Sequence, residues 1–354
     1  MPVQAEITFI IKRLAQEAGF ELVGVAPAHP APDWDRYADW VARGLAGRLH
    51  YLTDHRAQLR TSPKNLLPSA RSVICVGKLY NLPWPYSNEL SDLECAWISR
   101  YAWGTDYHVV IRNGLEQLAR RMREEIGTSF EFRICVDTAP LLERSLARRA
   151  GLGWIGKNTC LINQERGSWF FLGEMLVSLE LEPDFPAAER CGSCTRCIEA
   201  CPTQAIVASP QGGWELDARL CISYFTIELR GEIPSEHRAA VGRHVFGCDI
   251  CQEVCPWNRR APITGEPAFA PASAEHIAPR LDRLARLTHE EFRQLFRHTP
   301  VERARYTGFL RNVAVAMGNS KQAKFLPALE RLAEHSDPVV AEHARWAIAQ
   351  ILES

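Results

Sequence analysis

The stretch Cys191-Gly-Ser-Cys194-Thr-Arg-Cys197-Ile-Glu-Ala-Cys201-Pro202 decides much of the fold of this chain. Two residues separate each of its first three cysteines, and the fourth follows after three more residues and precedes a proline. Loops with this spacing place three thiolates around one face of a [4Fe–4S] cluster, whereas the fourth cysteine ligates a second cluster. The stretch therefore predicts a partner run elsewhere in the chain.

A second run is present at Cys248-Asp-Ile-Cys251-Gln-Glu-Val-Cys255-Pro256. It lacks the first cysteine of a complete run, and Cys221 is the only nearby candidate to replace it. Exchange of the fourth ligands between the runs predicts two [4Fe–4S] clusters. The two predicted ligand sets are Cys191, Cys194, Cys197 and Cys255, and Cys201, Cys221, Cys248 and Cys251.

Zinc and disulfides fit these cysteines less well. Structural zinc sites pair CxxC-type motifs across a longer loop, and the first run is too closely spaced for that. A disulfide framework is not expected in a long chain that has no secretory signal. Cys75 and Cys135 lie in apolar, strand-like runs and are most simply buried thiols, and Cys95 and Cys160 are also left outside the predicted clusters.

The composition is that of a globular protein. The chain has 354 residues, of which 46% are hydrophobic and 23% charged, with a formal net charge of −1. This length allows two or three domains. The overall charge predicts no polyanionic partner, so a nucleic-acid site would have to come from a local patch. Because no run reaches membrane-spanning length and no export signal is visible, we expect a cytoplasmic protein with no membrane partner.

The pattern of apolar residues divides the chain into three regions. In residues 1–185 it predicts an α/β or α+β layer domain, with α+β as the class of the whole chain; the helices are expected at 5–19, 34–46, 107–126 and 140–150 and the strands at 20–26, 72–77, 130–136 and 169–181. Residues 186–260 form the predicted cluster domain, followed by a Pro-rich linker. Residues 280–354 are predicted to be purely helical and similar to HEAT-type repeats, with helices at 288–298, 300–317, 321–335 and 337–352.

Asp137 follows the predicted strand 130–136, in the segment Val-Asp-Thr-Ala-Pro. Catalytic groups of layered domains concentrate at strand ends, but a turn or helix-capping role is the simpler interpretation of this position. A catalytic role as proton donor would require partial burial, because burial raises the pKa of a carboxylic acid toward neutrality.

The segment 151–157 contains the spacing GxGxxG. It follows a predicted helix instead of a strand, so a dinucleotide fingerprint is rejected. We expect a glycine cap at the end of that helix and then a loop with close backbone approach, in which Lys157, Asn158 and Thr159 face a polar ligand.

The C-terminal region carries the charge asymmetry. Between residues 280 and 331 there are eleven Lys or Arg against five Asp or Glu. A solvated helical face is the usual explanation of such a run, but the asymmetry favours a nucleic-acid surface. The residues predicted to face a phosphate backbone are Arg293, Arg297, Arg303, Arg305, Arg311, Lys321 and Lys324.

Taken together, these motifs resemble the epoxyqueuosine reductases, the cobalamin-dependent iron–sulfur enzymes of tRNA queuosine synthesis. The cysteine runs alone occur in many ferredoxin-like proteins, whereas Asp-Thr-Ala-Pro at 137–140 and Gly-Trp-x-Gly-Lys at 153–157 are far more specific. The resemblance covers nearly the whole chain and also includes segments 51–60, 67–74, 100–108, 167–174, 221–224, 303–305, 311–312 and 318–319.

The resemblance implies a nitroreductase-like domain that binds cobalamin, a ferredoxin-like dicluster domain, and a HEAT-like helical module that binds tRNA. It implies that Asp137 is the proton donor, and a monomer is the family expectation. The residues expected on the cobalamin side are Arg60, Tyr101, Asp137, Lys157, Asn158 and Ser223. The segment between the first run and Cys221 is longer than the family pattern, and we interpret it as a loop variation.

Asp106-x-His108 stands at the start of the predicted helix 107–126. Asp106 is at the N-cap position, where its side chain would accept a backbone N–H. The pair is also similar to the corrinoid motif DxHxxG, but Ile111 stands in place of its glycine. No histidine ligand to cobalt is therefore predicted.

The implied reaction reduces the epoxide of epoxyqueuosine at the tRNA wobble position to queuosine, with loss of the oxygen as water. An external low-potential donor would reduce the clusters, which suit one-electron delivery to cobalt, and Asp137 would protonate the oxygen. The basic tail would bind the anticodon arm with the base extruded into the pocket. Two alternatives are a reductive dehalogenase-like reductase of a small molecule and a pure electron carrier. The missing export signal and the basic tail count against the first, and the large N-terminal domain against the second.

Overall fold

The computed structural model describes residues 3–353. Its centre is a four-stranded sheet in the order β1-β2-β7-β4, in which every neighbouring pair is antiparallel. No helix within the described residues is long and apolar enough to cross a membrane. The strands are β1 (Leu22–Pro27), β2 (Ser72–Leu79), β4 (Phe132–Cys135) and β7 (Phe170–Val177).

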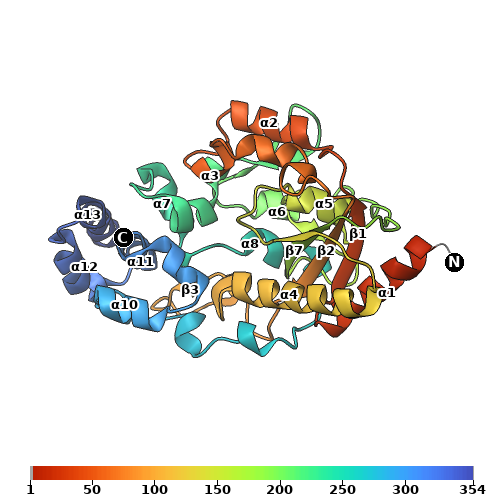
Figure 1. Ribbon diagram of the computed structural model, residues 1–354. Helices are drawn as coiled ribbons and strands as arrows, with labels where there is room; N and C mark the ends of the chain where they lie inside the picture. The colour runs from red at the N-terminus through yellow and green to blue at the C-terminus, as the bar shows by residue number, and fades with distance from the viewer. Residues whose placement is uncertain (1–2, 354) are drawn as a thin grey trace.

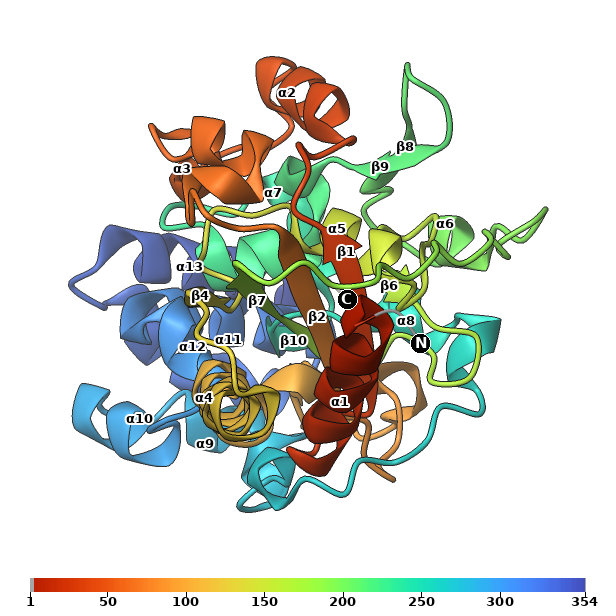
Figure 2. The ribbon, with the colours of Figure 1, turned by 45° about the vertical axis from the view of Figure 1, so that its right-hand side comes forward.

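Helices cover both faces of this sheet (Figure 2). On one face, α1 (Val3–Glu17) and α4 (Tyr107–Ile126) bury an apolar stripe against the strands. On the other face lies α5 (Glu143–Arg149), whose Leu146 packs with Cys75 of β2. All the helices and strands predicted for residues 1–185 are present with shifted ends, so the mixed helix and sheet class is confirmed. The predicted burial of Cys75 and Cys135 is confirmed as well.

The cluster region consists of short elements between long loops. They are α6 (Arg196–Glu199), β8 (Ile206–Ala208), β9 (Trp214–Leu216), α7 (Ser235–Val241), β10 (His244–Phe246) and α8 (Ile250–Glu253). Further short elements in the first region are α2 (Trp34–Ala42), α3 (His50–Thr53), β3 (Trp97–Ile98), β5 (Trp154–Ile155) and β6 (Leu161–Ile162). β10 pairs with β3, so the cluster region and the first region share backbone hydrogen bonds.

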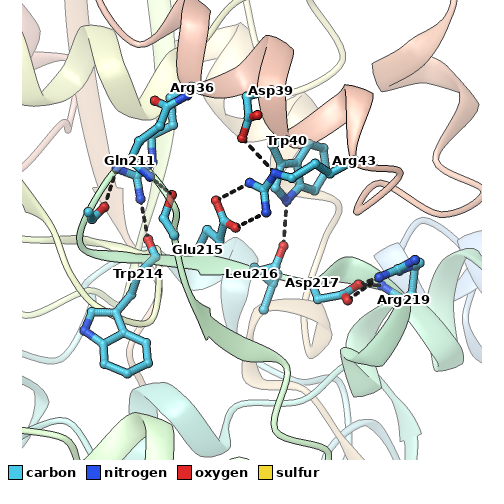
Figure 3. A network of polar contacts seen from close by, with 12 residues as sticks. Arg36, Asp39, Trp40, Arg43, Gln211, Trp214, Glu215, Leu216, Asp217 and Arg219 are labelled. Atoms are coloured by element: carbon cyan, nitrogen blue, oxygen red, sulfur yellow. Dashed lines mark hydrogen bonds and ion pairs between the residues drawn. The ribbon is translucent and has the colours of Figure 1, made fainter.

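The long segment before Cys221 is more than a loop variation, because it forms the β8–β9 hairpin that holds α2 in place (Figure 3). Trp40 of α2 donates its indole N–H to the carbonyl oxygen of Leu216 at 2.7 Å. Arg43 pairs with Glu215 at 2.6 Å, and only 6% of the Glu215 side chain is exposed. Because this ion pair is partly shielded from solvent, it fixes the position of α2 against the β8–β9 hairpin.

The C-terminal region is helical and lies at one end of the molecule (Figure 1). Its helices are α9 (Leu281–Leu284), α10 (His289–Leu295), α11 (Tyr306–Ser320), α12 (Leu326–Ala333) and α13 (Pro338–Leu352). The prediction of one helix over residues 300–317 is wrong at its start. Arg305 has a positive φ of 58°, and at this residue the chain passes from a 3-10 turn into α11. The core of this region also contains Trp97, Trp103 and Val245, so it packs on the two preceding regions.

Candidate active site

The structure brings the eight cysteines predicted as ligands into two groups of four. In the first group, burial and the neighbouring thiols of Cys255, Cys191 and Cys194 raise the pKa of Cys197 to about 11. Cys255 belongs to the second cysteine run, so the fourth thiol of this group comes from the other run. This is the exchange that the spacing predicts.

The second group contains Cys201, Cys221, Cys248 and Cys251. Burial raises the pKa of Cys248 far above its ordinary value, and the thiol of Cys221 raises it further. Burial also raises the pKa of Cys221, next to Cys201. A hydrogen bond with Cys160, a ninth cysteine that we placed outside the clusters, is the largest of the causes that raise the pKa of Cys251.

Iron–sulfur clusters fit these two groups. Each group offers four thiols, and the charge of bound iron would keep buried thiols ionised. The backbone N–H of Ala205 points at Cys201 Sγ at 3.3 Å, as expected around a thiolate ligand. Within residues 3–353 no three His, Cys, Asp or Glu side chains converge on a single metal position. A cubane cluster does not need such a position, because its cysteine ligands bind different iron atoms and are held apart by the cluster.

Lys157 and Asn158 hold the cysteine loops. Lys157 Nζ donates to the carbonyl oxygens of Gly192 at 2.7 Å and Cys194 at 2.9 Å. Asn158 is 4% exposed, and its Nδ2 donates to the carbonyl oxygen of Cys251 at 3.2 Å. Asn158 therefore uses its amide inside the protein, where we expected it to face a ligand. Gly153 confirms the close backbone approach, because an added Cβ would lie 2.1 Å from the Ile162 carbonyl oxygen.

A cavity of about 580 Å³ opens between α2, α3, the start of α5 and β9. Its walls combine aromatic and aliphatic faces with polar groups, among them Tyr37, Trp40, Leu52, Arg60, Asp137, Glu143, Lys157, Trp214 and Leu216. Arg60 is 5% exposed and donates to the carbonyl oxygen of Tyr51 at 3.1 Å, with its guanidinium 5.9 Å from the Tyr37 ring. A shallower depression of about 610 Å³ beside Pro186 contains no predicted site residue.

Of the remaining residues expected on the cobalamin side, Tyr101 and Ser223 are not among those that line the cavity. The Tyr101 ring packs against Tyr107, with 6.2 Å between ring centroids. Ser223 lies beside Cys221. A hydrogen bond from the Ser223 backbone lowers the pKa of the Cys221 thiol, but burial is the larger effect and raises it. Both residues therefore support groups next to the cavity.

Asp137 lines the cavity and follows β4 closely in the sequence. Its backbone is left-handed, with φ 47°, a conformation that costs a non-glycine residue about 1 kcal/mol or more. The hydroxyl of Tyr107 donates to Asp137 Oδ2 at 2.8 Å. His108 Nε2 lies 3.2 Å from the same oxygen, and 35% of the Asp137 side chain is exposed. These contacts hold the carboxylate in the cavity despite the strained backbone.

The electrostatics reverse one expectation for Asp137. Burial raises its pKa, but hydrogen bonds from His108 and Tyr107 and the charge of Arg303 outweigh burial, so the pKa lies below its ordinary value. A proton donor was expected to need a raised pKa, and Asp137 by itself does not meet this requirement. For His108, burial lowers the pKa, whereas hydrogen bonds with Asp106 and Asp137 raise it to about 9. At neutral pH the proton of this pair resides on His108.

Asp106 confirms its predicted cap and has a second role. Its Oδ1 accepts the backbone N–H of His108 at 2.9 Å, which caps α4, and lies 2.7 Å from His108 Nδ1. The histidine is thus held between two carboxylates. Such a ring keeps the orientation and the proton that a general acid needs.

Two further carboxyls lie next to Asp137. Burial and the charge of Asp137 raise the pKa of Glu143, in the first turn of α5, to about 7. Glu174 on β7 is 1% exposed, and burial raises its pKa well above its ordinary value. Its Oε1 has no hydrogen-bond partner among the described residues. Both groups can carry protons at neutral pH.

Arg303 belongs to this site, whereas we expected it to face a phosphate backbone. Its Nη2 pairs with Glu228 at 2.8 Å, and its Nη1 lies 3.7 Å from Asp137 Oδ2. The guanidinium is 5.9 Å from the Tyr51 ring at the cavity wall. The 3-10 turn that ends at Arg305 directs this side chain inward.

The structure also contradicts the prediction for Arg311. This residue is 1% exposed, because it lies on the inner face of α11. Its guanidinium donates to the carbonyl oxygens of Leu229 at 2.9 Å and Gly231 at 2.6 Å, and to that of Phe225. The exposed members of the predicted set are Arg293, Arg297, Arg305, Lys321 and Lys324. Of these, Lys324 pairs with Glu94, and Lys321 donates to Gln350.

Replacing Arg311 with alanine is expected to lower the free energy of unfolding by about 3–5 kcal/mol, because buried carbonyls lose their donor and a cavity forms. Chemical denaturation under anaerobic conditions would measure the loss. The matched control Arg297→Ala removes an exposed arginine of the same region and should change stability by no more than about 0.5 kcal/mol. Equal midpoints for the two variants would contradict the structural role.

Sequence reasoning missed Tyr107, His108 and Glu143 as site residues. His108 was visible in Asp106-x-His108, but its direction toward Asp137 depends on how α4 crosses the end of β4. Glu143 begins α5, shortly after Asp137 in the sequence, and this proximity was the available signal.

Two family models match the chain. The model described as Epoxyqueuosine reductase QueG, DUF1730, matches residues 60–138, and the 4Fe-4S double cluster binding domain matches residues 190–258. The first match includes Arg60 and Asp137. The second includes all eight predicted ligand cysteines.

Curated relatives match over nearly the whole length. The epoxyqueuosine reductase of Xanthomonas campestris pv. campestris is 43% identical over 346 residues, which cover 96% of this chain and 95% of that protein. The epoxyqueuosine reductase of Escherichia coli strain K12 is 41% identical over 347 residues, covering 97% and 89%.

Solved structures of epoxyqueuosine reductases have a fold similar to that of this chain. An epoxyqueuosine reductase bound to an epoxyqueuosine-modified tRNA-Tyr stem loop has a TM-score of 0.87 at 31% identity, covering 98% of this chain and 90% of that chain. The epoxyqueuosine reductase of Streptococcus thermophilus has a TM-score of 0.87 at 28% identity, covering 99% and 91%. This chain therefore belongs to the epoxyqueuosine reductase family and is an oxidoreductase with a double [4Fe–4S] cluster domain.

Proposed function

We propose that this chain reduces the epoxide of epoxyqueuosine in the anticodon arm of tRNA to queuosine, with cobalamin and two [4Fe–4S] clusters as cofactors. The observation that carries the proposal is the placement of Asp137, bound by Tyr107 and His108, in a large cavity that adjoins the second cysteine group. Leu49 and Ala218 line this cavity and belong to the apolar cluster against which Cys221 packs. Electrons and protons can thus reach one bound substrate from two sides.

The cavity suits cobalamin as well as the base. Trp40, Leu52 and Leu216 offer apolar faces for a flat macrocycle, and Arg60 and Lys157 offer donors for its polar side chains. Bound cobalamin would supply the reducing chemistry of a low-valent cobalt to the epoxide.

The protein supplies the protons. Converting an epoxide to an alkene and water consumes two electrons and two protons. His108, which holds the proton of the pair at neutral pH, passes it across 3.2 Å to Asp137, and Asp137 delivers it to the departing oxygen. Glu143, with a pKa of about 7, holds the second proton. Without protonation the oxygen would have to leave as a poor alkoxide leaving group.

The finer assignments belong to the same proposal. Residues 1–185 act as a nitroreductase-like cobalamin domain, 186–260 as a ferredoxin-like dicluster domain, and 280–354 as a HEAT-like module that binds tRNA. Exposed Arg293, Arg297 and Arg305 remain the candidates for phosphate contacts. Each such contact contributes to an affinity for tRNA that falls with salt concentration. The enzyme acts as a monomer in the cytoplasm and takes electrons from an external low-potential donor.

Anaerobic reconstitution with iron, sulfide and cobalamin tests the proposal. The holoprotein receives epoxyqueuosine-containing tRNA and dithionite, and mass spectrometry follows the nucleosides. We expect queuosine only when cobalamin is present. A protein that holds both clusters and cobalamin but forms no queuosine would refute the tRNA reaction and favour reduction of a small molecule.

The pH profile tests the proton source. Because the pKa of His108 is raised to about 9, it keeps its proton through neutral pH and loses it as pH rises through 9. We expect kcat/KM to fall above about pH 9, approaching tenfold per pH unit. His108→Gln keeps a hydrogen-bond donor that does not titrate, so its lower rate should lack this alkaline limb. An unchanged limb in His108→Gln would assign it to another group.

A further inference from the structure

The two cysteine groups lie in different surroundings. Cys221 and Cys248 of the second group pack against an apolar cluster that contains Leu49 and Ala218, which line the catalytic cavity. The first group instead packs on a small separate cluster, in which Cys191 and Cys255 contact Trp154, Ile162 and Trp257. Electrons that enter at the first group can therefore reach the cavity through the second.

Five arginines lie in the chain segments that carry the first group or pack on them, and we call them the arginine rim: Arg166, Arg190, Arg196, Arg259 and Arg260. Arg190 precedes Cys191 on the loop that leads into α6, and Arg196, the first residue of α6, precedes Cys197. The segment that follows Cys255 carries Arg259 and Arg260. α6 and α8 are in contact, which brings the two cysteine runs together.

The fifth member of the rim, Arg166, comes from the turn between β6 and β7. That turn packs on the segment after Cys255, because an added Cβ at Gly167 would lie 3.0 Å from Ala261 and 3.1 Å from the Trp257 carbonyl oxygen. Three separate parts of the chain thus bring arginines to one surface.

The arginine rim has no partners inside the protein. Arg190, Arg196, Arg259 and Arg260 are exposed, and Arg166 is partly exposed. None of the five guanidinium groups makes a hydrogen bond or ion pair with a residue of the described range 3–353. The carboxylates in the same segments are Glu165, Glu189 and Glu199, and Glu199 accepts a hydrogen bond from Thr195. The surface is therefore positive, in a chain of net charge −1.

We propose that the arginine rim is the docking surface for an acidic one-electron carrier protein, which reduces the first cluster. The inference rests on the proposed function, because it names the electron donor of that reaction. Each docking event transfers one electron and oxidises the carrier, so two events supply one epoxide reduction. A carrier that must leave after each electron needs a small interface, and unpaired surface charges give fast, salt-sensitive association without tight binding.

Stopped-flow reduction of the clusters tests this docking without any tRNA. The reconstituted holoenzyme is mixed with a reduced acidic ferredoxin or a reduced acidic flavodoxin, and with dithionite in parallel. Arg259→Glu/Arg260→Glu should slow cluster reduction by each effective carrier roughly tenfold or more and remove its salt dependence. Its rate with dithionite and its iron content should match wild type.

The control variant Arg120→Glu/Arg123→Glu makes the same charge change on α4, which belongs to neither cysteine group, and should reduce at the wild-type rate. Equal carrier rates in Arg259→Glu/Arg260→Glu and wild type would overturn the proposal, as would failure of both carriers to reduce clusters that dithionite reduces. A variant that is reduced normally but has a raised KM for tRNA would assign the rim to nucleic acid. Because cluster reduction needs no tRNA, failure of the epoxide reaction would be seen separately.

Discussion

Replacing Asp137 with asparagine is expected to lower the turnover of epoxyqueuosine-containing tRNA by about 10²–10⁴-fold, the usual contribution of a positioned general acid. Asparagine has nearly the same shape and can still accept the hydrogen bond that Tyr107 donates to Oδ2 at 2.8 Å. It cannot pass a proton from His108 to the epoxide oxygen. Single-turnover assays with dithionite would measure the chemical step apart from product release.

The controls for this variant separate chemistry from assembly. Asp137→Asn should keep wild-type iron content, cobalamin binding and affinity for the modified tRNA, because no cysteine contact depends on it. Asp282→Asn is the matched substitution at a surface carboxylate, 3.4 Å from Arg280, and should retain full activity. If Asp137→Asn turned over at more than about a tenth of the wild-type rate, another group would be the proton donor.

Removing single cysteine ligands is expected to lower the iron content from about eight to about four atoms per chain and to abolish turnover, because each variant loses one whole cluster. The exchange of fourth ligands makes a sharper prediction. Cys255→Ala should lose the same cluster as Cys191→Ala, although Cys255 lies in the second run. Cys201→Ala should correspondingly lose the same cluster as Cys248→Ala. The electron paramagnetic resonance spectrum of the retained, reduced cluster identifies which one is left.

Cys95→Ala is the control, because Cys95 is a partly exposed thiol that lies in neither group. It should keep both clusters and full turnover. If Cys255→Ala matched Cys248→Ala instead of Cys191→Ala, each run would hold its own cluster and the exchange would be refuted. Cys160→Ala removes the ninth cysteine. Loss of its hydrogen bond with Cys251 should change the properties of the second cluster without removing that cluster.

The sequence by itself determined the features that depend on short chain distances. Cysteine spacing restricts which thiols can reach one cluster, so the two groups could be assigned before any coordinates. Apolar periodicity likewise determined the helices and strands of residues 1–185, and Asp106 could be placed at the helix start. Each of these depends on a few consecutive residues, whose geometry varies little between folds.

Only the tertiary structure decided which charged side chains point where. Arg303 and Arg311 belong to one basic region of the sequence, yet the first reaches Asp137 and the second is buried on the inner face of α11. A charge count cannot distinguish them, because the direction of a side chain depends on which helix face packs inward and on the turn at Arg305. The lowered pKa of Asp137 has the same origin, since its causes come from α4 and from Arg303, distant segments that meet only in the folded chain.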